Sequence, residues 1–250
     1  MVTPHLHFIW GFKEGDTFGL IERIAIQSAC CHHPTWPATL WTRRIPTGSH
    51  WEKLKAAVPW LRTMPAPRID TFNGRPVPKY QHKADALRYS LLYSLGGVYM
   101  DLDTITLAPI PKEWLEKPYT IGLEYHADGS PIGLCNAVYM CAPFSRFGWR
   151  VLSEFQAFDP AVHAYAEFGV YRPLKWALEM AHDVHIVKGP LLGPMHWDIA
   201  AYWEREEPLR DVVIAHLWRT NHSDPVLRKL TEEDLRHGRF AYAQAAKRYV

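Results

Sequence analysis

A pair of glycines, Gly96 and Gly97, divides one stretch of the chain into two segments with different hydrophobic periods. Before the pair, apolar side chains recur every three or four residues from 81 to 95, which predicts a helix. After the pair, residues 98–100 form a short β-branched and aromatic run that is typical of a buried strand. Glycine directly after the last apolar residue is a common helix stop signal. The sequence therefore predicts a helix that leads at once into a strand.

The same alternation of helical and strand-like segments continues along the chain. Strands are expected at 6–10, 39–42, 68–71, 98–101, 119–124, 136–141, 184–187 and 212–216. A helix is expected at 18–31, and Ser49 is the expected N-cap of a short helix that ends before Pro59. This alternation predicts an α/β fold with a mostly parallel central sheet flanked by helices. At 250 residues the chain fits a single domain, residues 1–250.

Bulk properties exclude several functional classes. Lys and Arg number 28 against 26 Asp and Glu, so no overall positive field favours nucleic acid as a partner. No apolar run approaches the roughly 18 residues of a transmembrane helix, and the first residues lack a secretory signal pattern. We therefore expect a soluble cytoplasmic protein with no transmembrane segment, in which peripheral association with a membrane-borne acceptor stays open.

The cysteines do not suggest a disulfide framework. Four cysteines in a chain of this length, at 30, 31, 135 and 141, are expected to stay reduced. The run Cys30-Cys31-His32-His33 is a poor zinc site, because four adjacent residues cannot wrap one tetrahedral ion.

Two carboxylates, Asp101 and Asp103, follow the strand expected after the glycines. Carboxylates two residues apart at a strand end can share one hard divalent cation, and Mg²⁺ or Mn²⁺ commonly bridges such a pair to a diphosphate. An Asp-x-Asp triplet alone is also common in solvated loops, but the end of a strand is where open α/β sheets keep their ligands. Asp85 and Arg88 lie one helical turn apart, either as a surface ion pair or directed toward whatever the metal holds.

The residues up to the triplet resemble the signature of the sugar-binding region of the DXD-containing glycosyltransferases of family 32. That family includes yeast mannosyltransferases and is more distantly similar to clostridial glucosylating toxins. The resemblance rests on the run Ala84-Asp85-x-x-Arg88-Tyr89-x-x-Leu92-Tyr93-x-x-Gly96-Gly97-Val98-Tyr99-x-Asp101-x-Asp103. The N-terminal block His7-Phe8-Ile9-Trp10-Gly11 is similar to the family's first strand. Looser matches are Asn136-Ala137-Val138-Tyr139 and Ala215-His216-Leu217-Trp218.

This resemblance implies a GT-A (Rossmann-like) domain in which residues 1–110 bind the nucleotide sugar and residues 111–250 bind the acceptor. It implies a metal-dependent retaining glycosyltransferase (a hexosyltransferase) with Mn²⁺ or Mg²⁺ as the cofactor. The donor would be a nucleotide sugar, expected to carry UDP although guanine stays open. The acceptor would be a glycan, a glycolipid or other lipid-linked sugar, or a protein, as in polysaccharide biosynthesis.

The resemblance also assigns roles to individual side chains. Asp103 is the expected principal metal ligand, and Asp101 a second ligand or a contact to ribose and a metal-bound water. Asp85 and Arg88 match the family's contacts to the donor's ribose and sugar hydroxyls. Asp101, Asp103 and Arg88 are thus the expected catalytic residues. His216 is expected to complete the metal shell, with a hydrogen-bonded core histidine as the alternative.

Two further donor contacts are expected, each with an alternative. Trp10 ends the first strand and would stack on the base, unless it belongs to the core. Asn136 would lie beside the donor sugar, unless it serves as a cap or turn residue. Glu124 and Asp128 are the nearest unassigned acids. Because neither can be placed beneath the anomeric carbon, front-face attack is favoured over a covalent intermediate.

Two other functions compete with sugar transfer. A sugar nucleotidyltransferase needs a glycine-rich loop with an arginine after its first strand, and residues 11–16 lack the arginine and the closely spaced glycines. A catalytically degenerate scaffold that binds nucleotide sugars would have no need of all four residues Asp85, Arg88, Asp101 and Asp103. The acceptor is expected to contact the loops at 125–134, 156–170 and 189–200, because acceptor sites are built from variable loops.

Overall fold

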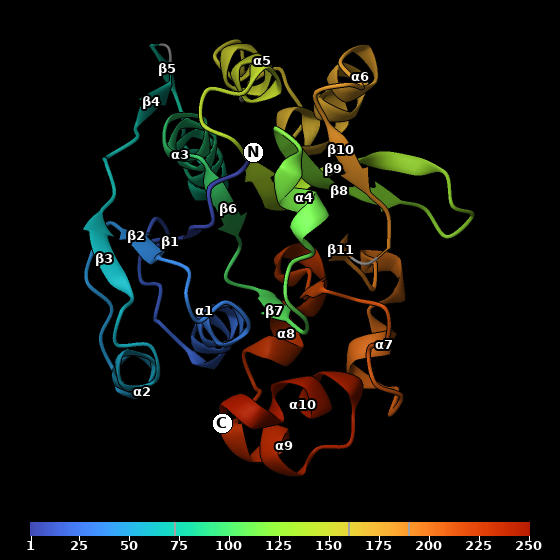
Figure 1. The fold of residues 1–250 in the computed structure, drawn as a ribbon. Helices are drawn as coiled ribbons and strands as arrows, with labels where there is room; N and C mark the ends of the chain where they lie inside the picture. The colour runs from blue at the N-terminus through green and yellow to red at the C-terminus, as the bar shows by residue number, and fades with distance from the viewer. Residues whose placement is uncertain (73, 160, 190) are drawn as a thin grey trace.

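The computed structural model describes residues 1–72, 74–159, 161–189 and 191–250, and a seven-stranded sheet runs through the described chain (Figure 1). The strand order is β10-β8-β9-β6-β1-β2-β3. The pairs of β1 with β2 and β6, of β2 with β3, and of β8 with β10 are parallel, whereas β9 runs antiparallel to both neighbours. The predicted mostly parallel sheet is therefore confirmed. Its strands are β1 (Leu6–Trp10), β2 (Ala38–Thr42), β3 (Arg62–Pro65), β6 (Gly97–Met100), β8 (Tyr119–Tyr125), β9 (Pro131–Cys141) and β10 (His185–Val187).

Two smaller sheets complete the strands that the structure describes. One has the order β11-β12-β7, with β11 at Leu191–Leu192, β12 at Ile214–His216 and β7 at Thr104–Thr106. The other is the pair β4 (Thr71–Phe72) and β5 (Arg75–Pro76). Since β7 follows directly after the Asp101–Asp103 turn, the smaller three-stranded sheet joins the C-terminal part of the chain to that turn.

Helices cover both faces of the central sheet. They are α1 (Leu20–His32), α2 (Ser49–Ala57), α3 (Tyr80–Leu95), α4 (Lys112–Glu116), α5 (Arg146–Phe155), α6 (Arg172–Glu179), α7 (Ala200–Trp203), α8 (Asp224–Leu227), α9 (Glu232–His237) and α10 (Ala241–Ala246). Within the described residues, none of the helices combines the length and the apolar character that a membrane crossing requires.

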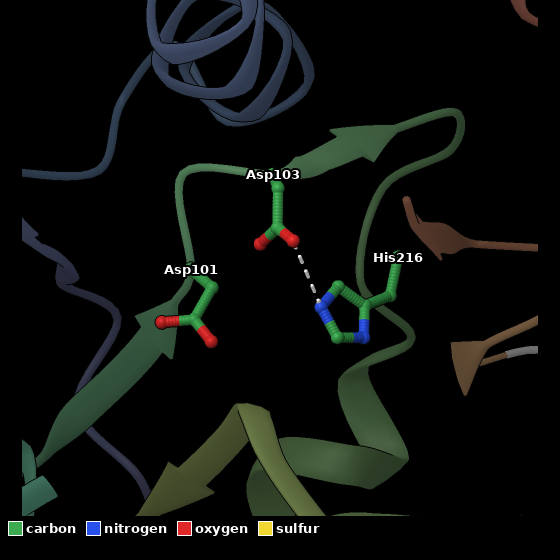
Figure 2. A group of neighbouring side chains, drawn as sticks. All are labelled: Asp101, Asp103 and His216. Carbon is green, nitrogen blue, oxygen red and sulfur yellow. Dashed lines mark ion pairs between the residues drawn. The ribbon is translucent and has the colours of Figure 1, made fainter. Parts of the chain in front are cut away.

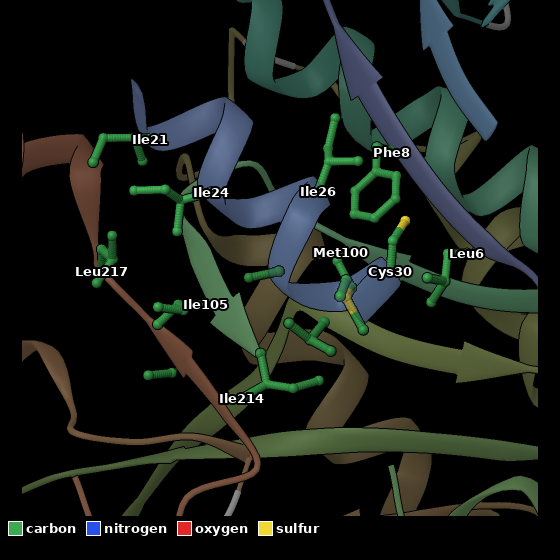
Figure 3. Packing of buried hydrophobic residues seen from close by; sticks show 14 of the residues in the cluster. Leu6, Phe8, Ile21, Ile24, Ile26, Cys30, Met100, Ile105, Ile214 and Leu217 are labelled. Atoms are coloured by element: carbon green, nitrogen blue, oxygen red, sulfur yellow. The ribbon is translucent and has the colours of Figure 1, made fainter. Parts of the chain in front are cut away.

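Strand β1 divides the core into two apolar layers, because consecutive side chains of a strand point to opposite faces. Phe8 lies in the same buried cluster as Ile24 of α1, Met100 and Ile105 (Figure 3). The adjacent Ile9 lies in the second cluster, which contains the apolar stripe of α3 and the aromatic side chains of α5. The sheet is therefore buried on both sides, as expected for parallel strands.

The two glycines between α3 and β6 are required by their surroundings. Their φ angles are +69° at Gly96 and +114° at Gly97, a region that residues with a side chain rarely adopt. A Cβ at Gly96 would lie 2.6 Å from Cδ of Pro143, and one at Gly97 would lie 2.7 Å from the carbonyl oxygen of His5. The predicted abrupt change from helix to strand is confirmed, and it aims the chain directly at Asp101.

Two local predictions are wrong. The strand expected at 68–71 is displaced: β3 lies earlier, at Arg62–Pro65, and β4 begins only at Thr71. The end of β3 at a proline is tolerated because β3 is an edge strand. Gly48, and not Ser49, is the N-cap of α2, since glycine at φ +97° starts the helix and Ser49 already lies within it. In the expected acceptor loops, positions 160 and 190 lie outside the described residues.

Candidate active site

A cleft of about 620 Å³ opens where β1 and β6 end. Its lining comes from both halves of the chain, including the segment after β1, helix α3, the 101–103 turn and residues 216–224. All seven side chains expected at the site line it: Trp10, Asp85, Arg88, Asp101, Asp103, Asn136 and His216. The structure thus brings them together, and their individual roles stay predictions.

Asp101, Asp103 and His216 form a compact group of ligand-type side chains (Figure 2). One ligand atom from each lies within 4.8 Å of the others, and Nε2 of His216 is 3.3 Å from Oδ2 of Asp103. The strand pairing explains this proximity, because β12 runs antiparallel to β7 and sets His216 opposite Thr104. The strand pairing therefore places a histidine that is distant in sequence next to the 101–103 turn.

Asp103 and His216 each stabilise the charged form of the other. Burial favours a higher pKa for Asp103, but His216 and the backbone N–H of Arg219, which is 2.9 Å from Oδ2, outweigh it and lower the pKa to about 2. Burial favours a lower pKa for His216, but Asp103 and then Asp101 raise it overall. Asp103 is consequently ionised throughout the neutral range.

Asp101 is held by partners from two strands and a helix. Its Oδ1 accepts a hydrogen bond of 2.6 Å from the Tyr99 hydroxyl and lies 3.1 Å from Nη2 of Arg88. Its backbone N–H donates to the carbonyl of Ala137 at 2.7 Å. Burial raises the pKa of Asp101, with Arg88 opposing the shift. This carboxylate is fixed in place before any ligand arrives.

Arg88, Asp85 and Asn136 form one network beside Asp101. Arg88 is only 5% exposed, so the alternative of a surface ion pair with Asp85 is wrong. Its Nε lies 3.4 Å from Oδ1 of Asp85, and its Nη1 donates to the backbone carbonyl of Asn136 at 2.8 Å. The Asn136 amide donates to Asp85 and to the Tyr89 hydroxyl, each at 2.8 Å. Asn136 is therefore a bridge within the network, and neither a helix cap nor a turn residue.

The surroundings of Trp10 fit both of the expected roles, a core residue and a residue that stacks on the base. Its side chain is buried, at 6% exposure, and packs edge-on against Phe18 with 5.7 Å between ring centroids. It also lines the cleft, and the Arg44 guanidinium lies 4.9 Å from its ring. Its indole N–H is buried with no hydrogen-bond partner in the described chain. Stacking on a base stays a prediction.

Arg219 and Glu22 are site residues that the sequence did not reveal. Besides the Arg219 backbone contact to Asp103, Nη1 of Arg219 lies 2.6 Å from Oε1 of Glu22, and its Nε lies 3.1 Å from Asp224. Trp218 precedes it in a left-handed conformation at φ +52°, with its indole donating to the carbonyl of Pro194 at 2.8 Å. A backbone donor and two distant ion-pair partners leave no local sequence signal.

The two unassigned acids lie in different surroundings. Glu124 is buried and lines the cleft beside Cys135, and burial raises its pKa. Asp128 lies on the exposed turn between β8 and β9, where it accepts hydrogen bonds from Ser130, and it does not line the cleft. Glu124 is therefore the one of these two that can reach a bound ligand.

Residues 22–120 match the family described as the glycosyltransferase sugar-binding region containing a DXD motif. Over these residues the chain is similar to this family. The matched stretch contains Asp85, Arg88, Asp101 and Asp103, the four residues on which the resemblance in the sequence rested.

Two of the curated relatives to which the chain is similar come from fungi. It is 27% identical over 236 residues to glucan organizing enzyme 1 of Cryptococcus neoformans var. grubii, which covers 90% of this chain and 59% of the relative. It is 29% identical over 130 residues to mannosyl phosphorylinositol ceramide synthase SUR1 of Saccharomyces cerevisiae, covering 51% of this chain and 28% of the relative. The chain thus spans less than two thirds of either relative.

Solved structures establish the fold. A crystal structure of galactosyltransferase LgtC in complex with donor and acceptor sugar analogs superposes with a TM-score of 0.57 at 14% identity, over 98% of this chain and 93% of that chain. The apo form of glycosyltransferase GlyE from Streptococcus pneumoniae TIGR4 gives a TM-score of 0.55 at 11% identity, over 99% and 60% of the two chains. The predicted GT-A fold is confirmed.

Proposed function

We propose that this protein is a metal-dependent, retaining glycosyltransferase that moves a hexose from a nucleotide sugar to an acceptor. The observation that carries the proposal is the group of Asp101, Asp103 and His216, whose ligand atoms lie within 4.8 Å of one another in a cleft that the donor-type residues Asp85 and Arg88 also line. A scaffold that only binds a sugar nucleotide has no need for this convergence of charge.

The donor set fits a divalent cation. Two carboxylates and an imidazole suit Mn²⁺, and Mg²⁺ with additional waters. Asp103 is ionised, with a pKa of about 2, and Nδ1 of His216 is buried without a hydrogen-bond partner among the described residues. Asp103 would be the principal ligand, with His216 and Asp101 completing the protein's share. When bound, such an ion acts as a Lewis acid for the departing diphosphate.

The chain's own residues would orient the donor. Asp85 presents a carboxylate that can accept hydrogen bonds from ribose or sugar hydroxyls, and the Asn136 amide holds it in place. Arg88 is occupied by Asp85, Asp101 and Asn136, so its proposed role is to position these groups. Trp10 would stack on the base, with UDP as the expected nucleotide.

Retention would proceed by front-face attack, in which the departing phosphate accepts the acceptor's proton. The surroundings of Glu124 support this route, because a carboxyl group whose pKa is raised by burial is a poor nucleophile.

The acceptor would be a glycan, a lipid-linked sugar or a protein, as in polysaccharide biosynthesis. Residues 1–110 would form the donor half and residues 111–250 the acceptor half. The four unpaired cysteines support a cytoplasmic location.

Donor hydrolysis without acceptor tests this function. UDP- and GDP-linked glucose, galactose and mannose would be incubated with the protein, with and without Mn²⁺, and release of the nucleoside diphosphate measured. We expect Mn²⁺-dependent release from at least one donor and its loss on chelation. Donor binding without any release or transfer would favour the scaffold, and absence of metal-dependent binding to every donor would contradict the proposal.

A further inference from the structure

One wall of the cleft is formed by a π-helical turn, η1 (Glu167–Tyr171), that lies directly against β9. Two glycines make this approach close. A Cβ at Gly133 would lie 2.5 Å from the carbonyl oxygen of Val170, and one at Gly169 would lie 3.2 Å from Nδ2 of Asn136. Single π-turns are rare and occur frequently at functional sites. The π-helical turn therefore lies next to Asn136, which belongs to the network of Arg88, Asp85 and Asn136 described above.

The side chains that η1 and the two residues before it, here counted as part of this wall, bring to the cleft are aromatic or small. Tyr165, Ala166, Gly169, Val170 and Tyr171 all line it. Tyr165 is 43% exposed and Tyr171 is 50% exposed. Tyr165 is partly covered, since its ring lies beside His82 and 5.1 Å from the Lys79 ammonium. The ring of Tyr171 has no stacking, cation–π or hydrogen-bond contact with any residue that the structure describes.

The wall brings no charge into the cleft. Glu167, its acidic residue, is held by Arg172, with 2.6 Å between Oε1 and Nη2. The Arg172 guanidinium in turn lies 4.3 Å from the Phe168 ring, and neither charged residue lines the cleft. The cleft lining also includes the polar side chains of Asp101, Asp103 and Arg219. A ligand against η1 thus meets aromatic and aliphatic surface beside a polar site.

We propose that η1 forms the acceptor subsite and that it takes a neutral hexopyranose, with the Tyr171 ring as its stacking platform. This inference rests on the proposed sugar transfer. A pyranose has one face of C–H groups that packs on an aromatic ring and a rim of hydroxyls that needs polar partners, and the wall and the adjoining network supply these two surfaces. An acidic or phosphorylated acceptor would find no cation among the residues of this wall that line the cleft.

The test compares transfer with hydrolysis. Methyl α- and β-glycosides of glucose, galactose and mannose serve as acceptors with the donor that the wild type hydrolyses, and acceptor KM, kcat and acceptor-free hydrolysis are measured. Tyr171→Ala is expected to raise the acceptor KM about tenfold and to lower the ratio of transfer to hydrolysis. Tyr171→Phe keeps the ring and is expected to stay near wild type. Trp149→Ala is the matched control, because Trp149 is an equally exposed aromatic residue of α5 outside the cleft.

Each other outcome contradicts the inference in a recognisable way. An acceptor KM in Tyr171→Ala equal to that of Trp149→Ala removes the stacking role. A fall in hydrolysis parallel to transfer places Tyr171 with the donor instead. A wild type that hydrolyses donor but transfers to none of the six glycosides overturns the neutral hexose class. Absence of hydrolysis and of metal-dependent donor binding in the wild type would instead contradict the proposed function itself.

Discussion

Asp103 is the carboxylate of the cleft whose surroundings most strongly favour its ionised form, with a pKa of about 2. Asp103→Ala is expected to abolish Mn²⁺-dependent donor hydrolysis while the protein stays folded, because its removal leaves no apolar cavity. Calorimetric titration with Mn²⁺ and nucleoside diphosphate, together with a thermal melt, measures both effects. Asp128→Ala, an exposed carboxylate outside the cleft, is the control. Unchanged metal-dependent binding in Asp103→Ala would show that the ion binds elsewhere.

Substitutions of Trp10 test whether this core side chain also binds the donor nucleotide. Because the ring is buried, Trp10→Ala is expected to destabilise the fold by about 3–5 kcal/mol. The milder Trp10→Phe keeps an aromatic core residue and is the better probe of base stacking. We expect weaker nucleotide binding in Trp10→Phe than in wild type, measured by calorimetry. Nucleotide affinity equal to wild type in a destabilised Trp10→Phe would assign the indole to the core alone.

At the scale of single elements, the turn from α3 into β6 depends on glycine. Gly97→Ala is expected to destabilise the fold by about 3 kcal/mol or more, because its Cβ would lie 2.7 Å from the His5 carbonyl oxygen in a disfavoured backbone conformation. Gly129 also has a positive φ, +83°, but its Cβ would meet only the Lys188 ammonium at 3.9 Å. Urea unfolding of Gly97→Ala and Gly129→Ala separates the clash from the backbone cost, which is about 1 kcal/mol. Equal losses in the two variants would contradict the steric explanation.

Strand β1 contains a buried histidine that makes stability depend on pH. Trp41 donates its indole N–H to Nδ1 of His7 at 3.1 Å, so Nε2 carries the proton and donates to the Gly96 carbonyl at 3.1 Å. Burial, and then the charge of His5, lower the pKa of His7 to about 3. The unfolded chain, with a histidine pKa near 6.5, therefore binds a proton that the folded chain does not, and stability falls as pH drops below about 6.5.

The measurement for His7 is the free energy of unfolding in urea at several pH values between 7.5 and 4. In wild type, His7 is expected to contribute a loss of up to about 1.4 kcal/mol per pH unit across this window. In His7→Gln this part of the slope should disappear, while the contributions of other buried histidines, such as His33, stay in both proteins. Parallel slopes for the two proteins would show that His7 does not titrate on unfolding.

The elements also show how far sequence alone could reach. Helix α3, the glycine stop and β6 were predictable because their periods and stop signals are local, and Asp101 and Asp103 followed from them. The strand at 68–71 was misplaced because Arg62–Pro65 ends at a proline, which only an edge position permits. The contacts of His216 and Arg219 to Asp103 depend on the β7–β12 pairing and on a backbone N–H, which no spacing in the sequence encodes. The resemblance to the family predicted His216 as a site residue, whereas no feature of the sequence predicted Arg219.

At the scale of the whole molecule, the Glu22–Arg219 ion pair links the first helix to the C-terminal side of the cleft. Oε2 of Glu22 accepts from the backbone N–H of Gly19 at 3.0 Å, and Oε1 lies 2.6 Å from Arg219. With its side chain held in this way, Arg219 presents its backbone N–H to Asp103 at 2.9 Å. The N-terminal helix therefore helps to hold a proposed metal ligand that it does not touch.

Glu22→Gln is expected to release the Arg219 side chain and to raise the Mn²⁺ concentration for half-maximal donor hydrolysis by about tenfold, as outer contacts of metal sites commonly do. Glu232→Gln is the matched control, because Glu232 of α9 pairs with Arg23 of α1 at 3.1 Å and lies outside the cleft. Both variants remove an ion pair between the first helix and the C-terminal part of the chain, so both should lower the melting temperature. Only Glu22→Gln should change the metal requirement. An equal change in both variants would mean that general loosening of the fold, and not the contact to Arg219, sets the affinity for metal.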